Sequence, residues 1–195
     1  TNKFTALTKR ITDETVTLNR IKDKLQDCEG AADRLQNLIA ERGSAYMRVF
    51  EAICAEQEIL IDLYSPLMTR LSSAEGTLKK LSFSVSRVAD VAKWASAGEL
   101  LLDLRQKGSF KGKGTLCQLG HESLKAVWET GTASDVSKAM ADFRTEYRDA
   151  FLERAPVAKS QVVDYRAWSK RFAKWLYSTD HISIQYSIDY DGVDI

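Results

Sequence analysis

Proline and glycine are scarce in this sequence. Two prolines and ten glycines interrupt 195 residues, of which 28% are charged and 44% are hydrophobic. A chain with so few breaks and so many charges is typical of a helix-rich, well-solvated protein. It is also too apolar to remain disordered.

Cysteine and long apolar runs are equally limited. Cys28, Cys54 and Cys117 are widely spaced, and an odd number of cysteines makes no disulfide framework but suits a reducing compartment. No apolar run approaches the roughly 20 residues that span a bilayer, and no charged-then-apolar leader opens the sequence. We therefore expect a soluble, cytoplasmic protein that makes no membrane contact.

An excess of charge of either sign is lacking too. Lys and Arg number 28 against 27 Asp and Glu. The average charge therefore supplies no long-range attraction for nucleic acid, and an electrostatic partner must be met by a local patch.

An apolar series with a period of seven runs through the first third of the chain. Its members are Phe4, Ile11, Leu18, Leu25, Ala32, Ile39, Tyr46, Ile53, Leu60 and Leu67. A companion series three residues later is mixed, with Glu14, Arg42, Glu56 and Arg70 among its members. A seven-residue period held this long keeps one stripe facing one partner helix. This predicts a coiled-coil interface at Phe4, Ile11, Leu18, Leu25, Ile39, Tyr46, Ile53 and Leu60.

Pro66 is expected to end this arm, because proline lacks a backbone donor and disfavours helix at Ser65. We therefore place a coiled-coil arm at 1–65 and a small α+β domain at 66–195. Gly30 and Gly43 each cost about 1 kcal/mol relative to alanine but leave the heptad phase unchanged. A helical hairpin that turns at Gly43 is the alternative to one continuous helix.

The remainder predicts mainly α structure with a small β part. Apolar and small polar residues alternate from Leu81 to Ser86, as in a half-buried strand. Helices are expected at 90–104, 122–129, 134–154 and 162–177, with Ser134 as an N-cap. Residues 182–190 alternate again, and Asp191-Gly192 predicts a hairpin with a return strand from Val193 to Ile195. The fold class is thus a long coiled-coil helix followed by a small helical domain with an antiparallel strand pair.

A glycine-rich basic loop at 105–115 is the main candidate binding element. It fails the phosphate-loop pattern, because Lys107 stands where glycine is needed and Gly114 where Ser or Thr is needed. Four cations remain on the loop, with no acid before Glu122, and are a candidate nucleic-acid contact: Arg105, Lys107, Lys111 and Lys113. An ordinary solvated loop is the preferred alternative.

Other patterns indicate packing more than chemistry. Trp168, Phe172 and Trp175 share one helix face while Arg166, Lys170 and Lys174 share another, as in a core helix with a solvated rim. Cys117 and His121 are four residues apart, but two ligands do not make a zinc site. No Ser or Cys nucleophile has a base near it in the sequence. We therefore predict no metal and no catalytic residue in this chain.

Several strings resemble the TrlF-like AAA ATPases, large bacterial SMC/RecN-like proteins of the ABC type that often carry a PHP phosphoesterase-type domain. The strings lie at 59–71, 81–95, 98–105, 108–116, 165–182 and 184–195. The likeness covers about residues 46–195, and the earlier heptads fit the family as generic coiled coil. The resemblance implies an internal fragment, namely the returning coiled-coil arm and the start of the C-terminal half of a split ATPase head.

The resemblance also implies partners and a role. The partners would be the outgoing arm and the N-terminal half-head, and DNA or a second copy of the chain are further candidates. ATP and Mg would belong to the parent protein, since the family's ATP-contacting residues map onto no residue here. The implied role is to couple ATP-driven head engagement to DNA handling in repair or phage defence. A stand-alone coiled-coil scaffold or adaptor is the alternative, and a self-sufficient enzyme with a site in 105–121 is the third hypothesis.

Overall fold

A computed structural model describes residues 2–191 and 193–194 and shows a mainly helical chain with a small antiparallel sheet. The chain divides into two compact units after Ala45. The first unit consists of helix α1 (Asn2–Glu29) and the beginning of helix α2 (Ala31–Ser72). The second unit begins at Tyr46, so the remainder of α2 belongs to the folded domain. The predicted fold class is confirmed.

The first unit is helical throughout its described residues. At Gly30, between α1 and α2, helical hydrogen bonds persist: the Gly30 amide donates to the Gln26 carbonyl and the Arg34 amide to the Gly30 carbonyl, both at 3.1 Å. Gly43 lies inside α2. The alternative prediction of a helical hairpin at Gly43 is therefore wrong. The chain direction does not reverse at Gly30 either.

Pro66 does not end α2, which contradicts the expected break. The helix continues to Ser72, and the contacts of Tyr64 just before the proline help to offset the lost hydrogen bond. The Tyr64 ring lies 4.8 Å from the Phe83 ring and 5.6 Å from the Tyr186 ring. After the proline, the Thr69 hydroxyl donates to the Ser65 carbonyl at 2.9 Å. Local propensity is here overridden by tertiary contacts.

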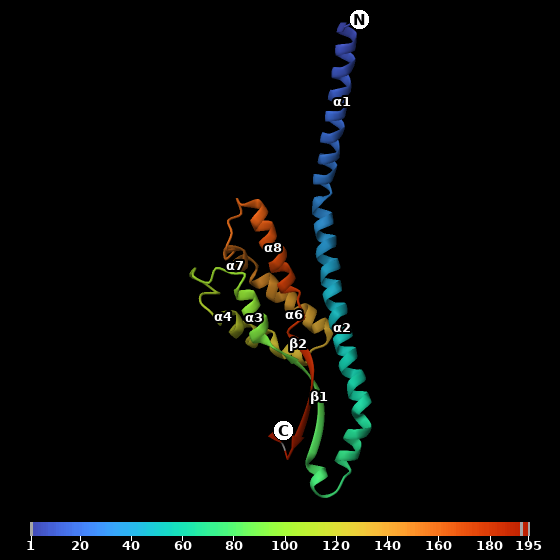
Figure 1. Ribbon diagram of the computed structural model, residues 1–195, viewed down its shortest axis with the longest axis vertical. Helices are drawn as coiled ribbons and strands as arrows, with labels where there is room; N and C mark the ends of the chain where they lie inside the picture. Colours follow the sequence, from blue (N-terminus) through green and yellow to red (C-terminus); the bar gives the residue numbers. More distant parts are fainter. Residues whose placement is uncertain (1, 192, 195) are drawn as a thin grey trace. The chain divides into compact units, whose positions relative to one another are not determined.

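The sheet is a long two-stranded ribbon with a short third strand. Strand β1 (Leu81–Ala89) follows the 3₁₀ turn η1 (Gly76–Lys80) and pairs antiparallel with β2 (Ile182–Tyr190), as Figure 1 shows. Strand β3 (Val193–Asp194) pairs with the end of β2, so the strand order is β1-β2-β3. The expected hairpin is thus present on its described residues, while Gly192 and Ile195 lie outside them. β1 is three residues longer than predicted.

The register gives the ribbon one apolar and one polar face. Phe83 pairs with Ile188 and Val85 with Tyr186, whereas Ser84 pairs with Ser187 on the other face. The two serine hydroxyls are 2.6 Å apart. The apolar face is the one that meets Tyr64 of α2. The alternation of apolar residues with serine in β1 follows from this two-sided environment.

Short helices complete the domain (Figure 1). They are α3 (Val91–Glu99), α4 (Thr115–Ser123), α5 (Lys125–Thr130), α6 (Ala133–Glu146), α7 (Arg148–Glu153) and α8 (Val162–Leu176). The expected helix at 90–104 ends at Glu99, and the expected one at 134–154 is divided at Tyr147. α4 was missed. The N-cap of α6 is Thr132, which forms a capping box with Asp135, and not Ser134.

Trp94 occupies the centre of the core. Its ring stacks on Trp175 at 4.8 Å and meets the edges of Trp128 at 5.2 Å and Phe143 at 5.8 Å. Gly98 permits this packing, because a β-carbon there would overlap the Trp175 ring. Tyr46 and Phe50 of α2 are buried in the same core. The helix α2, which begins in the arm, therefore also contributes side chains to the domain core.

Candidate functional site

The basic loop between α3 and α4 is anchored and not freely mobile. Phe110 is fully buried and stacks on Phe151 of α7, with ring centroids 4.6 Å apart and planes at 9°. Two backbone hydrogen bonds close the loop: the Gly112 amide donates to the Leu104 carbonyl at 3.0 Å, and the Asp103 amide to the Arg154 carbonyl at 2.9 Å. One aromatic side chain therefore fixes a loop that is otherwise polar.

Arg154 is a buried side chain that anchors the backbone of the loop. This side chain is only 2% exposed, and its Nη2 donates to the Lys107 carbonyl at 2.8 Å. Its guanidinium carbon also lies 5.9 Å from the centre of the Phe110 ring. Gly108 has a φ of 125°, and a β-carbon there would lie 2.6 Å from Arg154 Nη2. Glycine is required at 108 both for the backbone angle and for the approach of this guanidinium.

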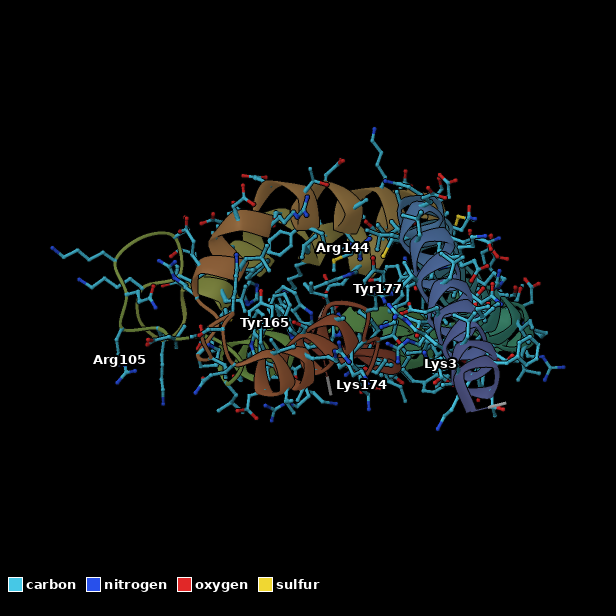
Figure 2. All side chains as sticks on the ribbon, turned by 90° about the horizontal axis from the view of Figure 1, so that it is seen from above. Lys3, Arg105, Arg144, Tyr165, Lys174 and Tyr177 are labelled. Carbon is cyan, nitrogen blue, oxygen red and sulfur yellow. The ribbon has the colours of Figure 1, made fainter. Side chains whose placement is uncertain are left out.

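The charge of the loop is smaller than the sequence indicated. Arg105 Nε donates to Asp103 Oδ1 at 2.9 Å, and the hydrogen bonds from Arg105 lower the pKa of Asp103 to about 2. The grouping of Arg105 with the unbalanced cations is thus corrected, because the neutralising acid lies two residues upstream. Lys107, Lys111 and Lys113 remain, all exposed and absent from the ion pairs seen among residues 2–191 and 193–194. Figure 2 shows the long side chains of this loop, with Arg105 labelled, extending away from the helices.

The phosphate-loop pattern is also absent from the geometry. The loop follows α3 and not a strand, and the Gly114 amide at the N-terminus of α4 donates to Glu99 Oε1 at 2.7 Å. A carboxylate thus occupies the place that a phosphate would take. What the loop can do chemically is present three separate ammonium groups on a fixed backbone.

The predicted coiled-coil residues separate into two groups. In the first unit, Phe4, Ile11, Leu18, Leu25 and Ile39 are 51–76% exposed. In the second unit, Tyr46 is 3% exposed and stands edge-on to Tyr177 at 5.7 Å. Tyr46 is therefore corrected from interface to core, because the chain's own domain covers it. Ile53 and Leu60 are half-buried.

The helix with interleaved aromatics and cations has the predicted arrangement. Trp168, Phe172 and Trp175 of α8 are buried. Trp168 Nε1 donates to the Leu101 carbonyl at 2.7 Å, and Trp175 Nε1 to the Trp94 carbonyl at 2.8 Å. The two indole N–H groups of this aromatic face are thus hydrogen-bonded inside the core. Because the rings are buried, bases cannot stack on them.

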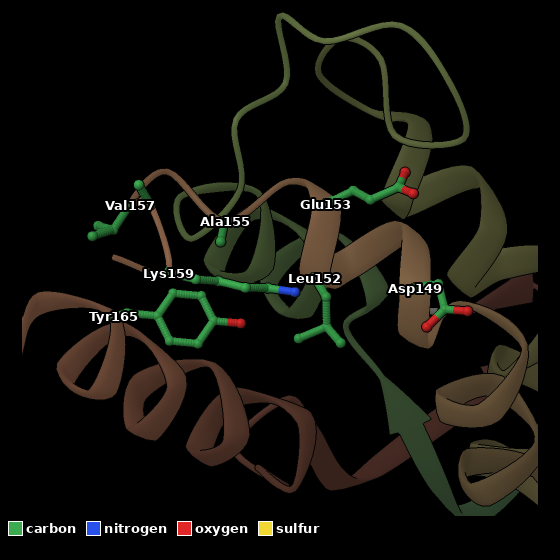
Figure 3. A pocket seen from close by; sticks show the side chains of 8 residues that line it. Asp149, Leu152, Glu153, Ala155, Val157, Lys159 and Tyr165 are labelled. Carbon is green, nitrogen blue, oxygen red and sulfur yellow. The ribbon is translucent and has the colours of Figure 1, made fainter. Parts of the chain in front are cut away.

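A metal-binding cluster is not assembled in the part of the chain that the structure describes. No group of three His, Cys, Asp or Glu side chains in that part could hold a metal. A pocket of about 480 Å³ lies between α7 and α8, lined by Asp149, Glu153, Lys159 and Tyr165 among others (Figure 3). Its charged groups are exposed and of both signs, so they define no single ligand. No described helix is long and apolar enough to cross a membrane.

Three buried polar residues were missed by the sequence reasoning. Arg154 anchors the loop, and Arg87 donates to Cys54 Sγ at 2.7 Å and to the Glu129 carbonyl at 3.3 Å. The His181 ring meets the Trp128 ring edge-on, with centroids 4.4 Å apart. Nothing in the local sequence marks these three as buried, since each depends on partners more than 30 residues away. Phe110, a lone aromatic among glycines and lysines, was the available signal for the anchored loop.

Comparison with known proteins adds no family. No protein-family model, no curated protein and no solved structure matches this chain. The resemblance to TrlF-like ATPases therefore stays a prediction that rests on the quoted strings.

The anchoring of the loop leads to a prediction. Arg154→Met should remove the hydrogen bond to the Lys107 carbonyl and leave that carbonyl poorly paired, which costs about 1–3 kcal/mol. Trypsin should then cleave faster after Lys107, Lys111 and Lys113, as followed by mass spectrometry of the released peptides. Arg148→Met, which removes an exposed cation from α7, is the control. An unchanged cleavage pattern in Arg154→Met would show that Phe110 alone fixes the loop.

Proposed function

We propose that this chain is the coiled-coil arm and head base of an SMC/RecN-like ATPase that couples ATP-driven head engagement to DNA handling in repair or phage defence. The observation that carries the proposal is α2, which is a single helix from Ala31 to Ser72. Its N-terminal part presents exposed apolar residues at heptad spacing. Its C-terminal part inserts Tyr46 and Phe50 into the domain core.

This arrangement supports a transmitting role. A helix is stiff along its axis, and its side chains are close-packed where they enter a core. A partner helix that engages the arm would act on the same helix whose Tyr46 packs on Phe50 and on the ring of Tyr177. The chain itself supplies no nucleotide contact in this proposal. ATP and Mg belong to the parent, with the outgoing arm and the N-terminal half-head as partners.

The basic loop is the proposed DNA contact of this piece. Lys107, Lys111 and Lys113 stand on a loop whose backbone is fixed by Phe110 and Arg154. A fixed backbone lowers the entropy that is lost when the lysines meet a phosphate backbone. Such contacts read no base, so the contact would hold duplex DNA without sequence preference.

Salt dependence tests this contact. Each phosphate neutralised on duplex DNA contributes about 0.9 to the slope of log affinity against log salt concentration. Lys111→Ala/Lys113→Ala should therefore weaken binding equally for unrelated duplex sequences and flatten the slope by about two. The measurement is fluorescence anisotropy of labelled duplexes over a salt series. Lys170→Ala/Lys174→Ala on α8 removes two exposed cations outside the loop and should leave the slope unchanged.

Two outcomes would count against the proposal. An unchanged affinity and slope in the loop double variant would remove the DNA contact from this loop. The second test is to sequence the reading frame of the gene on either side of the part that encodes this chain. A phosphate-binding loop upstream and an LSPG-type signature downstream are expected, and their absence would favour the stand-alone scaffold or adaptor, whose function needs only the exposed heptad stripe.

A further inference from the structure

A single glycine separates the two helices of the first unit. Gly30 belongs to neither α1 nor α2, although α1 leads directly into α2 (Figure 1). The Gly30 amide still donates to the Gln26 carbonyl, and the Arg34 amide to the Gly30 carbonyl. Gly43, by contrast, lies inside α2 without such an interruption. The break at Gly30 is therefore not a general effect of glycine in this part of the chain.

The side chain of Arg34 bonds to the backbone at this interruption. Arg34 Nη2 donates to the Asp27 carbonyl at 2.8 Å and to the Asp27 carboxylate Oδ1 at 2.7 Å. In a continuous helix the Asp27 carbonyl accepts the amide of the residue four positions later. The guanidinium thus competes with the helical ladder for this carbonyl, and a side chain that enters the ladder is a known cause of a kink.

Glycine at position 30 lets Arg34 reach Asp27. A β-carbon there would lie 2.9 Å from Arg34 Nη1, so the guanidinium uses space that a side chain would fill. At Gly43 a β-carbon would meet nothing within 4 Å. Replacement by alanine therefore raises helix propensity at both positions, but it obstructs the bridge from Arg34 to Asp27 only at position 30.

The bridge lies on the outer side of the arm. By the helical period, Asp27, Gly30 and Arg34 are on the side of the helix away from Leu25 and Ala32 of the seven-residue series. A partner helix on that stripe would therefore leave the bridge uncovered. The bridging side chains are 52% and 75% exposed, and an exposed ion pair is weak and screened by salt. Because the cost of glycine inside a helix is also small, the bridged and the continuous helix are close in free energy.

We propose that Asp27, Gly30 and Arg34 form a hinge in the arm. While the Arg34 guanidinium bridges the carbonyl and the carboxylate of Asp27, the helix stays interrupted and can change direction at Gly30. When the bridge opens, α1 and α2 join into one continuous helix. The inference rests on the proposed function in that it takes these helices to be an arm. It adds the point at which the arm bends and the side chain that controls the bend.

Distances between two spin labels, measured by double electron–electron resonance on the full chain, test the hinge. Arg20→Cys and Glu41→Cys place the labels at exposed positions that are about 30 Å apart along a continuous helix. The native cysteines are replaced by serine, and dilution with unlabelled protein restricts the signal to distances within one chain. The wild-type arm should give a broad distribution because both forms are populated. Salt at 1 M, where the Debye length is about 3 Å, should narrow it toward the continuous helix.

Four variants assign the effect to the bridge. Gly30→Ala should shift the ratio of continuous to interrupted helix about fivefold toward the continuous form. Gly43→Ala is the matched control and should stay as broad as the wild type. Arg34→Met should narrow the distribution, because the guanidinium no longer competes for the Asp27 carbonyl. Asp27→Asn keeps that carbonyl but removes the ion pair, so its distribution should not respond to salt.

Any of four results overturns the hinge. A wild type as narrow as Gly30→Ala would mean that the arm is already continuous, and a distribution that stays broad in Gly30→Ala would place the flexibility elsewhere. Equal narrowing in Gly43→Ala would reduce the effect to helix propensity. An unchanged distribution in Arg34→Met would show that this side chain does not control the interruption.

The salt slope for duplex DNA tests the proposed function separately. A missing hinge with a slope that still depends on Lys111 and Lys113 overturns the hinge alone. An intact hinge with a slope that does not depend on these lysines counts against the proposed function and leaves the hinge in place.

Discussion

The free energy of unfolding of this protein should fall by about 3 kcal/mol as the pH is lowered from 6.5 to about 4, because His181 must be neutral to stay folded. The side chain is 4% exposed, and the centre of its ring lies 4.4 Å from that of Trp128 and 6.2 Å from that of Trp94. Burial lowers the pKa of His181 from 6.5 to about 4. Neither ring nitrogen has a hydrogen-bond partner among the described residues.

The charged groups around His181 act in both directions. Asp180 and Asp90 raise its pKa and Lys93 lowers it, but burial is the largest cause. Above pH 6.5 the imidazole is neutral in both the folded and the unfolded chain and contributes no pH dependence. Below pH 6.5 His181 becomes protonated in the unfolded chain but stays neutral in the folded chain. Stability is therefore lost until His181 of the folded chain also becomes protonated near pH 4.

Urea denaturation at a series of pH values measures this effect. His181→Phe keeps a ring in the aromatic site and should be nearly flat in the same pH window, apart from the carboxylates that begin to titrate at its lower end. His121→Gln removes the exposed histidine of α4 and should retain the full dependence. If His181→Phe loses stability as steeply as the wild type, another group is responsible.

Self-association through the first unit should be lost in Leu18→Asp/Leu25→Asp. Both leucines lie in the seven-residue series, at 51% and 57% exposure, so the structure leaves this apolar stripe open. Without another helix, two copies of the arm cover each other's stripe. Two carboxylates in the middle of that seam would be desolvated without partners, which removes the association.

Sedimentation velocity distinguishes the two forms. The wild type should be a concentration-dependent dimer and the double variant a monomer. Asn19→Asp/Gln26→Asp adds the same two charges one residue after each leucine, outside the seam, and should remain a dimer. A wild type that is monomeric at every concentration would mean that the stripe needs a different helix and does not pair with itself.

The sequence predicted those features that depend on periodicity. The alternation in β1 and the aromatic face of α8 reflect one-sided burial, which repeats at a fixed interval along the chain. The loop at 105–115 was also predicted, because glycines and lysines there have no apolar period. These elements appear where they were expected.

The failures occur where distant contacts decide the local structure. Pro66 stays helical because Tyr64 packs on Phe83 and Tyr186, and the long helix expected up to Arg154 is divided at Tyr147. The Tyr147 ring lies 4.8 Å from Phe143 and 5.6 Å from Phe110 of the loop. Distant contacts also explain why the heptad residues of α2 are exposed before Tyr46 and buried in the core from Tyr46 onward. An apolar residue in a heptad does not reveal whether a partner chain or its own domain will cover it.

The pairing of β1 with β2 also constrains how the domain reaches its native state. Ser84 and Ser187 meet across the ribbon although 103 positions separate them in sequence. Closing so long a loop costs entropy before any contact compensates for it, so ribbon formation should be slow and late in folding. During synthesis β1 leaves the ribosome long before β2 exists. The serines at every second position of β1 keep the unpaired strand polar along one side. This limits its tendency to aggregate until β2 has been synthesised and can pair with it.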